Sequence, residues 1–132
     1  MDWKQYYVKK LSGKVFDLEE VKTVISNVIV KPLNLELHKS RQKQIEINSH
    51  EVVMPDCTIR YQIEQDKLLF NKFDLDGNLF ETNAIASIYL ENGQYGINQF
   101  QNQLYSDLFE AIEGTFCYLL TGTTIMIFKR SC

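Results

Sequence analysis

The feature that most constrains this chain is a series of short segments in which apolar and polar residues alternate. Ile59, Tyr61 and Ile63 alternate with polar residues, and a turn at Gln65-Asp66 then leads into an apolar segment, Leu68-Leu69-Phe70, which continues to Phe73 as the second arm of a hairpin. A period of two is typical of a strand with one buried face. Turn signals follow the segments at short intervals, at Gln65-Asp66, Asp76-Gly77-Asn78 and Asn92-Gly93. Connections this short favour an antiparallel meander, because a parallel pair needs a crossover of a dozen or more residues.

The same period predicts further strands on both sides of this region. Leu33, Leu35 and Leu37 alternate with polar residues, as do Ile45 and Ile47, and the polar residues 38–43 between them are typical of a hairpin connection. Residues 84–90 form another apolar segment, and Met54-Pro55-Asp56 interrupts the run before Cys57 because proline cannot donate to a ladder.

Two segments have helical spacing instead. Asp17 resembles a helix N-cap, and a short helix over residues 18–26 follows from the apolar spacing there, although many β-branched residues leave a strand as the alternative. A longer helix is predicted over residues 99–113, ended by Gly114. Residues 115–120 and 124–128 would then form a closing hairpin around Gly122.

Length and composition agree with this picture. The chain has 132 residues, of which 45% are hydrophobic and 12% aromatic, and it shows no repeat or linker. We therefore predict a single domain over residues 1–132, of the α+β class and rich in β structure. It would be a single antiparallel curved sheet or small barrel with one helix of the C-terminal half packed on it.

The charge and the cysteines narrow the range of partners. A formal net charge of -3 gives no basic field for nucleic acid, and no apolar run could span a membrane. Because no signal peptide is visible, we expect a soluble protein, cytoplasmic by default. The three cysteines are too widely spaced for a zinc site, so no metal and no cofactor is expected; in an exported protein Cys57 and Cys117 could pair.

Five segments, namely Cys57, Tyr61-Gln62-Ile63, Asp66 to Phe70, Leu108 to Ile112 and Tyr118 to Ile125, together resemble the META-domain family. That family has a cysteine-containing stretch, a hairpin, a short helix of the F..AL type and a final hairpin of the Y.v.g..L.L type. Leu11 to Phe16 is similar to its opening L.G..W motif. The resemblance covers about two thirds of the chain.

The resemblance implies a non-enzymatic domain that acts through protein binding and is associated with stress tolerance or virulence. Two alternatives remain at this point. A lipocalin-like barrel would have the same alternation and would carry a small apolar ligand. A bacterial immunity-type inhibitor would have this size and mild acidity and would block a toxin by surface complementarity.

Two aromatic segments are candidates for a partner surface. Trp3, Tyr6 and Tyr7 lie close together near the start of the chain, where they either pack against the body or, if exposed, mark a binding surface. The second segment is rich in glutamine and tyrosine. The predicted surface residues are Trp3, Tyr6, Tyr7, Tyr95, Gln99, Gln103 and Tyr105.

Three other groups of residues share some features of functional sites, but none of them is predicted to be one. Asp74 to Glu81 contains the residue types of a calcium loop but lacks the EF-hand spacing, so a solvated turn is expected. His50 and Cys57 would need a third orienting group to act as a catalytic pair, so no catalytic residue is predicted. Lys39, Arg41 and Lys43 alternate, but a solvated surface explains them better than a nucleic-acid stripe.

Overall fold

The computed structural model describes residues 3–12, 15–100 and 103–122. Within these residues, seven strands form one antiparallel sheet in which each strand pairs with the next along the chain. The elements are α1 Trp3–Ser12, α2 Leu18–Ile25, the π-helical segment η1 Ser26–Val30, α3 Lys31–Lys39, β1 Glu46–Ile47, β2 Glu51–Val53, β3 Thr58–Glu64, β4 Lys67–Phe73, β5 Ile85–Glu91, β6 Gln94–Ile97, β7 Leu104–Tyr105 and α4 Leu108–Thr121.

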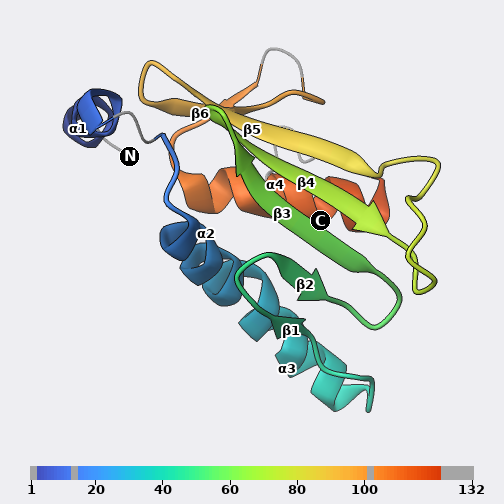
Figure 1. The fold of residues 1–132 in the computed structure, drawn as a ribbon. Helices are drawn as coiled ribbons and strands as arrows, with labels where there is room; N and C mark the ends of the chain where they lie inside the picture. Colours follow the sequence, from blue (N-terminus) through green and yellow to red (C-terminus); the bar gives the residue numbers. More distant parts are fainter. Residues whose placement is uncertain (1–2, 13–14, 101–102, 123–132) are drawn as a thin grey trace.

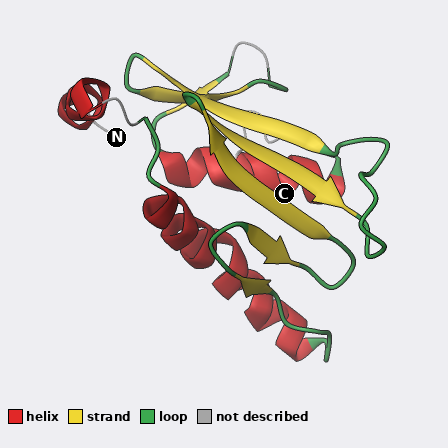
Figure 2. Cartoon of the chain, viewed as in Figure 1, coloured by secondary structure: helices red, strands yellow, loops and turns green. Residues whose placement is uncertain are grey.

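The sheet curls around one helix (Figure 1). α4 lies across the concave face, and the span from α2 to α3 runs along the end of the sheet formed by β1 and β2 (Figure 2). The predicted fold class, an α+β chain built on a curved antiparallel sheet with a helix from its C-terminal half, is confirmed.

β4 is a central strand with one buried face. In β4, Leu68 and Phe70 are buried on the inner face, while Lys67 at the start of the strand is exposed. The turn between β5 and β6 places Asn92 and Gly93 at φ values of 51° and 82°. Two successive positive φ values match the right-handed twist of the flanking strands, which explains why an Asn-Gly pair occurs there.

One helical span runs without interruption from Leu18 to Lys39, and it corrects the predicted strand over residues 33–37. Leu33 and Leu37 are spaced by four and both are half-buried, whereas Leu35 is exposed. Pro32 lies inside this span, directly after the π-helical segment η1, and a proline at such a position removes one hydrogen bond from the helical ladder. The alternation of three leucines therefore fits a helix that buries one side as well as it fits a strand.

The predicted helix over residues 18–26 is confirmed, with the Asp17 side chain accepting a hydrogen bond from the Glu19 N–H at 3.1 Å. The predicted hairpin connection over residues 38–43 is wrong, because His38 and Lys39 still belong to α3. Asn34 links the helix to the following strand: its Oδ1 accepts from the Ile45 N–H at 2.7 Å, and its Nδ2 donates to the Ile45 carbonyl at 3.1 Å.

The C-terminal helix lies further along the chain than predicted. α4 begins after Asp107, whose side chain accepts from the Glu110 N–H at 2.9 Å, and it continues through Gly114 to Thr121. A Cβ on Gly114 would lie 3.2 Å from the Tyr105 hydroxyl, so glycine here permits close packing and does not end the helix. The predicted strand over residues 115–120 is therefore wrong, and the predicted strand over residues 124–128 lies outside the described residues.

Gly122 is the residue that ends α4. Its φ is 76°, and its N–H donates to the Tyr118 carbonyl, which is the left-handed C-cap for which glycine is preferred. The core forms where α4 meets the sheet and α2. Phe116 packs edge-on against Phe70 with ring centroids 5.6 Å apart, and Val21 and Ile25 of α2 are fully buried beside α4.

A lysine lies inside this core. The Lys72 side chain is on the inner face of β4, and its Nζ donates to the Leu119 carbonyl in the last turn of α4 at 2.7 Å. The same Nζ lies 4.2 Å from the centroid of the Phe80 ring. A positive charge at a helix C-terminus is favourable, so this contact joins the sheet to the end of α4.

Candidate functional site

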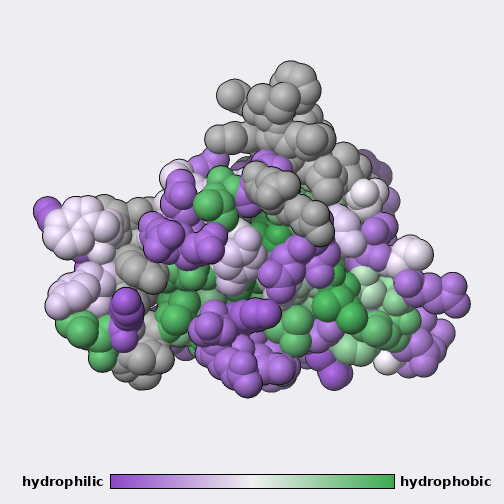
Figure 3. Space-filling view, turned by 90° about the horizontal axis from the view of Figure 1, so that it is seen from above, coloured by the Kyte–Doolittle hydropathy of each residue, from purple (hydrophilic) through white to green (hydrophobic). Residues whose placement is uncertain are grey.

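α1 exposes an apolar stripe to solvent. Trp3, Tyr7 and Leu11 recur every four residues and therefore share one side of the helix. All three are exposed, Trp3 by 70% and Leu11 by 68%, and the neighbouring Val8 is exposed as well. Figure 3 shows these pale and green side chains on a helix that projects from the body. The side chain of Tyr6, which was predicted to belong to the same surface, lies outside the described residues.

The charge of this helix differs from that of the rest of the chain. α1 contains three lysines and no acidic residue, and the Lys4 and Lys10 side chains are exposed. The first 14 residues hold four lysines and one aspartate, whereas the rest of the chain holds ten basic and 16 acidic residues. An apolar and basic element therefore stands beside an acidic body.

Tyr95 and Tyr105, two of the predicted surface residues, lie in the core. They are exposed by only 1% and 3%. Burial raises the pKa of Tyr105 to about 12, with a smaller contribution from the Glu110 charge, and burial also raises the pKa of Tyr95. Neither ring is available to a partner in the folded chain. The sequence did not distinguish them from surface tyrosines because both precede or follow polar residues that face outward.

Gln99 and Gln103 occupy the end of the sheet near β6 and β7. The Gln99 side chain is exposed, and its Oε1 accepts from the Ser87 N–H at 3.2 Å. The neighbouring Asn98 donates through Nδ2 to the Ser87 hydroxyl, while Gln103 is half-buried. The predicted surface thus separates into two parts. Trp3 and Tyr7 belong to α1, and the glutamines belong to a polar edge of the sheet.

An apolar groove lies between the helices. It has a volume of about 390 Å³ and opens to solvent between η1 and α3 on one side and α4 on the other. Sequence reasoning missed it because the α3 wall was predicted as a strand; the four-residue spacing of Leu33 and Leu37 was the available signal. The residues that shape it include Val28, Pro32, Leu33, Glu113, Phe116 and Leu120.

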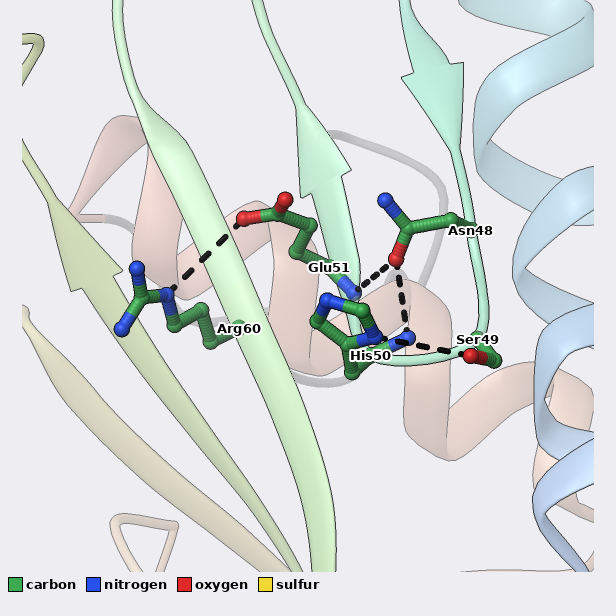
Figure 4. Close-up of polar contacts among 5 residues, drawn as sticks. All are labelled: Asn48, Ser49, His50, Glu51 and Arg60. Atoms are coloured by element: carbon green, nitrogen blue, oxygen red, sulfur yellow. Dashed lines mark hydrogen bonds and ion pairs between the residues drawn. The ribbon is translucent and has the colours of Figure 1, made fainter.

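The turn between β1 and β2 carries a group of polar side chains (Figure 4). The Asn48 Oδ1 accepts from the His50 and Glu51 N–H groups, each at 3.0 Å. The Ser49 hydroxyl lies 3.4 Å from the His50 Nδ1, and the Glu51 carboxylate lies 3.8 Å from Arg60 Nε. Glu51 is therefore directed to Arg60 and not to His50. Within the described part of the chain, the contact recorded for the His50 ring is with the Ser49 hydroxyl and not with a carboxylate, which a serine nucleophile would need to orient its base.

Cys57 and His50 lie in different environments. Cys57 is a free thiol that is fully buried, so the bridge to Cys117 is not formed, and His50 is exposed on its turn. Desolvation, followed by the nearby Asp56 charge, raises the pKa of Cys57 to about 12. A thiol with this pKa is protonated at neutral pH and is a weak nucleophile.

Two other groupings have ordinary structural roles. The Asp74 Oδ1 accepts from the Asp76 and Asn78 N–H groups, each at 2.9 Å, so this carboxylate closes a turn. No cluster of three or more metal-ligating side chains occurs in the described part of the chain. Lys39 is the last residue of α3 and pairs with Glu36 at 2.8 Å, and Arg41 and Lys43 lie in the loop that follows.

The α1 stripe and the groove between the helices are the surfaces from which a function can be inferred. None of the helices in the described residues has the length and apolar character needed to cross a membrane. No protein-family model, no curated protein and no solved structure matches this chain.

Proposed function

We propose that this chain is a META-like, non-enzymatic domain that acts by binding a protein, and that α1 is the element that binds. The observation that supports this proposal is the exposure of Trp3, Tyr7 and Leu11 on one side of a helix. Large apolar side chains grouped on a surface are characteristic of interaction sites, and tryptophan and tyrosine are the residues most enriched at their energetic centres.

The arrangement supports protein binding more than a carrier role. A lipocalin-like carrier holds its ligand inside the sheet, but here α4 packs against the inner face with Phe116 and Leu119 buried. The groove of about 390 Å³ lies outside that interior, between helices. An immunity-type inhibitor is one form that a protein-binding domain could take, and the association with stress tolerance or virulence belongs to the same proposal.

The test uses a matched pair of exposed apolar residues. Trp3→Asp with Tyr7→Asp would be compared with Leu75→Asp, because Leu75 is also 70% exposed but lies in the turn between β4 and β5. The tagged proteins would be used to recover partners from the native source, and each recovered protein would be purified and titrated by calorimetry.

We expect the α1 variant to weaken binding of the purified partner by roughly 30-fold or more, because truncated hot spots cost about 2 kcal/mol or more. Leu75→Asp should bind as the original protein does. Equal binding by all three proteins would remove α1 from the interaction and contradict the proposal.

A further inference from the structure

The chain carries two apolar surfaces that the rest of the described fold does not explain. One is the stripe of Trp3, Tyr7 and Leu11 on α1, and the other is the groove between α3 and α4. We propose that α1 of one copy docks into this groove of a second copy. This inference rests on the proposed function, since it names the partner that α1 binds.

The shapes of the two surfaces correspond. The groove is lined by Leu33 of α3 on one side and by Phe116 and Leu120 of α4 on the other. Its volume of about 390 Å³ is within the range of roughly 300–1,000 Å³ found for pockets that bind small molecules, so it has room for large apolar side chains. Amphipathic helices bind such grooves through anchors spaced by three or four residues, which is the spacing of the α1 stripe.

The charges also correspond. Glu113 is the charged residue among the described residues that line the groove, and α1 brings lysines and no carboxylate. The exposed Lys10 precedes Leu11 of the stripe. An anionic lipid surface would attract α1 as well, but it would repel the acidic remainder of the chain, with its ten basic and 16 acidic residues. A second copy offers both the acidic surface and the apolar groove.

The position of α1 favours docking in another copy over docking in its own. α1 precedes the N-terminal end of α2 and lies apart from it (Figure 1). The groove begins at η1, beyond the C-terminal end of α2. Leu18, at the start of α2, and Val28, at the groove, are ten positions apart on a continuous helix. About 15 Å of helix therefore separates the start of α2 from the groove. If each copy gives its α1 and receives another, the pair closes with two-fold symmetry and does not extend into a filament.

Sedimentation of the full chain over a range of concentrations tests the proposal. We expect a dimer whose dissociation constant rises by roughly 30-fold or more in Trp3→Asp and in Pro32→Arg. Pro32 is exposed at the groove, so an arginine there blocks the groove and repels α1 without removing a core side chain. The matched controls are Leu35→Asp on α3, which does not line the groove, and Leu75→Asp; both should dimerise normally.

Mixing the two defective variants gives a stricter test. A pair made of one Trp3→Asp copy and one Pro32→Arg copy retains one intact α1 facing one intact groove. The mixture should therefore associate more tightly than either variant alone. A mixture that associates no better than its components would overturn the proposal, and circular dichroism of each variant checks that the fold is retained.

A photo-crosslinker placed at position 32 of the full chain identifies the occupant directly. We expect a product of two chains joined between position 32 and α1. A crosslink to α1 of the same chain, to residues 123–132 of the same chain, or a dimer insensitive to Pro32→Arg would each overturn the proposal. So would association that requires vesicles containing phosphatidylserine.

The two proposals can fail separately. If the chain is monomeric but the α1 variants fail to bind a different purified protein that the original chain binds, the second copy is excluded as the partner and the binding function of α1 stands. If the chain is monomeric and α1 variants lose no partner, both proposals fail.

Discussion

α1 and α4 are both helices with apolar residues at helical spacing, but they have opposite environments. α4 buries Ile112, Phe116 and Leu119 against the concave face of the sheet, whereas α1 leaves Trp3, Tyr7 and Leu11 in solvent. The difference lies in what each helix can reach. α4 packs on β5, β6 and β7 inside the curve of the sheet, and α2 packs against α4, so the described core forms without a residue of α1. Apolar spacing alone thus does not tell whether a helix supports the fold or is available for binding.

The largest loss of stability should result from shortening one buried aromatic side chain of α4. Phe116→Ala removes a fully buried ring that packs on Phe70, so we expect a loss of about 3–5 kcal/mol in the free energy of unfolding. Urea denaturation followed by circular dichroism measures it. Phe109→Ala is the control, because Phe109 is on the same helix but exposed. Equal effects at the two positions would contradict the described burial of α4.

The connection between the sheet and the end of α4 should contribute less. Lys72→Met keeps most of the side-chain volume but leaves the Leu119 carbonyl without its donor, so we expect a loss of about 2 kcal/mol. Lys67→Met, at an exposed position of the same strand, should change the stability by less than about 0.5 kcal/mol. A stability that rises in Lys72→Met would show that desolvation of the ammonium outweighs its hydrogen bond.

The buried thiol predicts a dependence on alkaline pH that α1 does not share. The pKa of Cys57 is about 12 in the folded chain and 9.0 as its reference value, so the folded state holds the proton more tightly. This contribution to stability is complete below about pH 9 and is lost as the pH rises toward the folded pKa. At pH 10 we expect a loss of about 1 kcal/mol.

Cys57→Ala isolates this contribution. The variant should be less stable than the original chain at pH 7, because it leaves a small cavity, but its stability should fall less between pH 8 and pH 10. The denaturation midpoint measured at each pH provides the comparison. Parallel pH profiles for the two proteins would mean that the thiol is not protected from solvent. Tyr61 and Tyr105, whose pKa values burial raises to about 12, lose their contributions above pH 10 in both proteins.

The smallest effect on stability should come from α1 itself. Trp3→Ala and Tyr7→Ala change exposed side chains, so we expect less than about 0.5 kcal/mol in the free energy of unfolding of the isolated chain at low concentration. The same measurement at concentrations that favour the dimer should show a larger difference, because association stabilises the folded state by mass action. A large effect on the dilute chain would mean that α1 packs on its own body.

Much of the sheet was predictable from the sequence. Strand β3 follows from the period of two, and β4 and β5 follow from apolar segments bounded by turn residues such as Asn92 and Gly93. The Asp17 cap and the helix after it were predictable for a similar local reason. The leucines of α3 were misassigned because a run with a period of two also contains residues four positions apart. Residues four apart share one side of a helix, so the pattern fits both structures.

The candidate surface was predictable only in part. The sequence located the aromatic residues of α1, but it could not tell that Trp3 would be exposed while Tyr95 and Tyr105 would be buried. It contained no sign of the groove, whose walls come from residues about 80 positions apart in α3 and α4.

By itself, the sequence determined an antiparallel, β-rich domain, since alternation and turn residues act over a few neighbouring positions. Tertiary structure decided which helix fills the sheet. Gly114 illustrates the difference: as a local signal it predicts the end of a helix, but packed against Tyr105 it lies in the middle of one. Burial of α4 outweighs the helix-ending tendency of one glycine, which costs about 1 kcal/mol, and the same choice leaves α1 exposed to solvent.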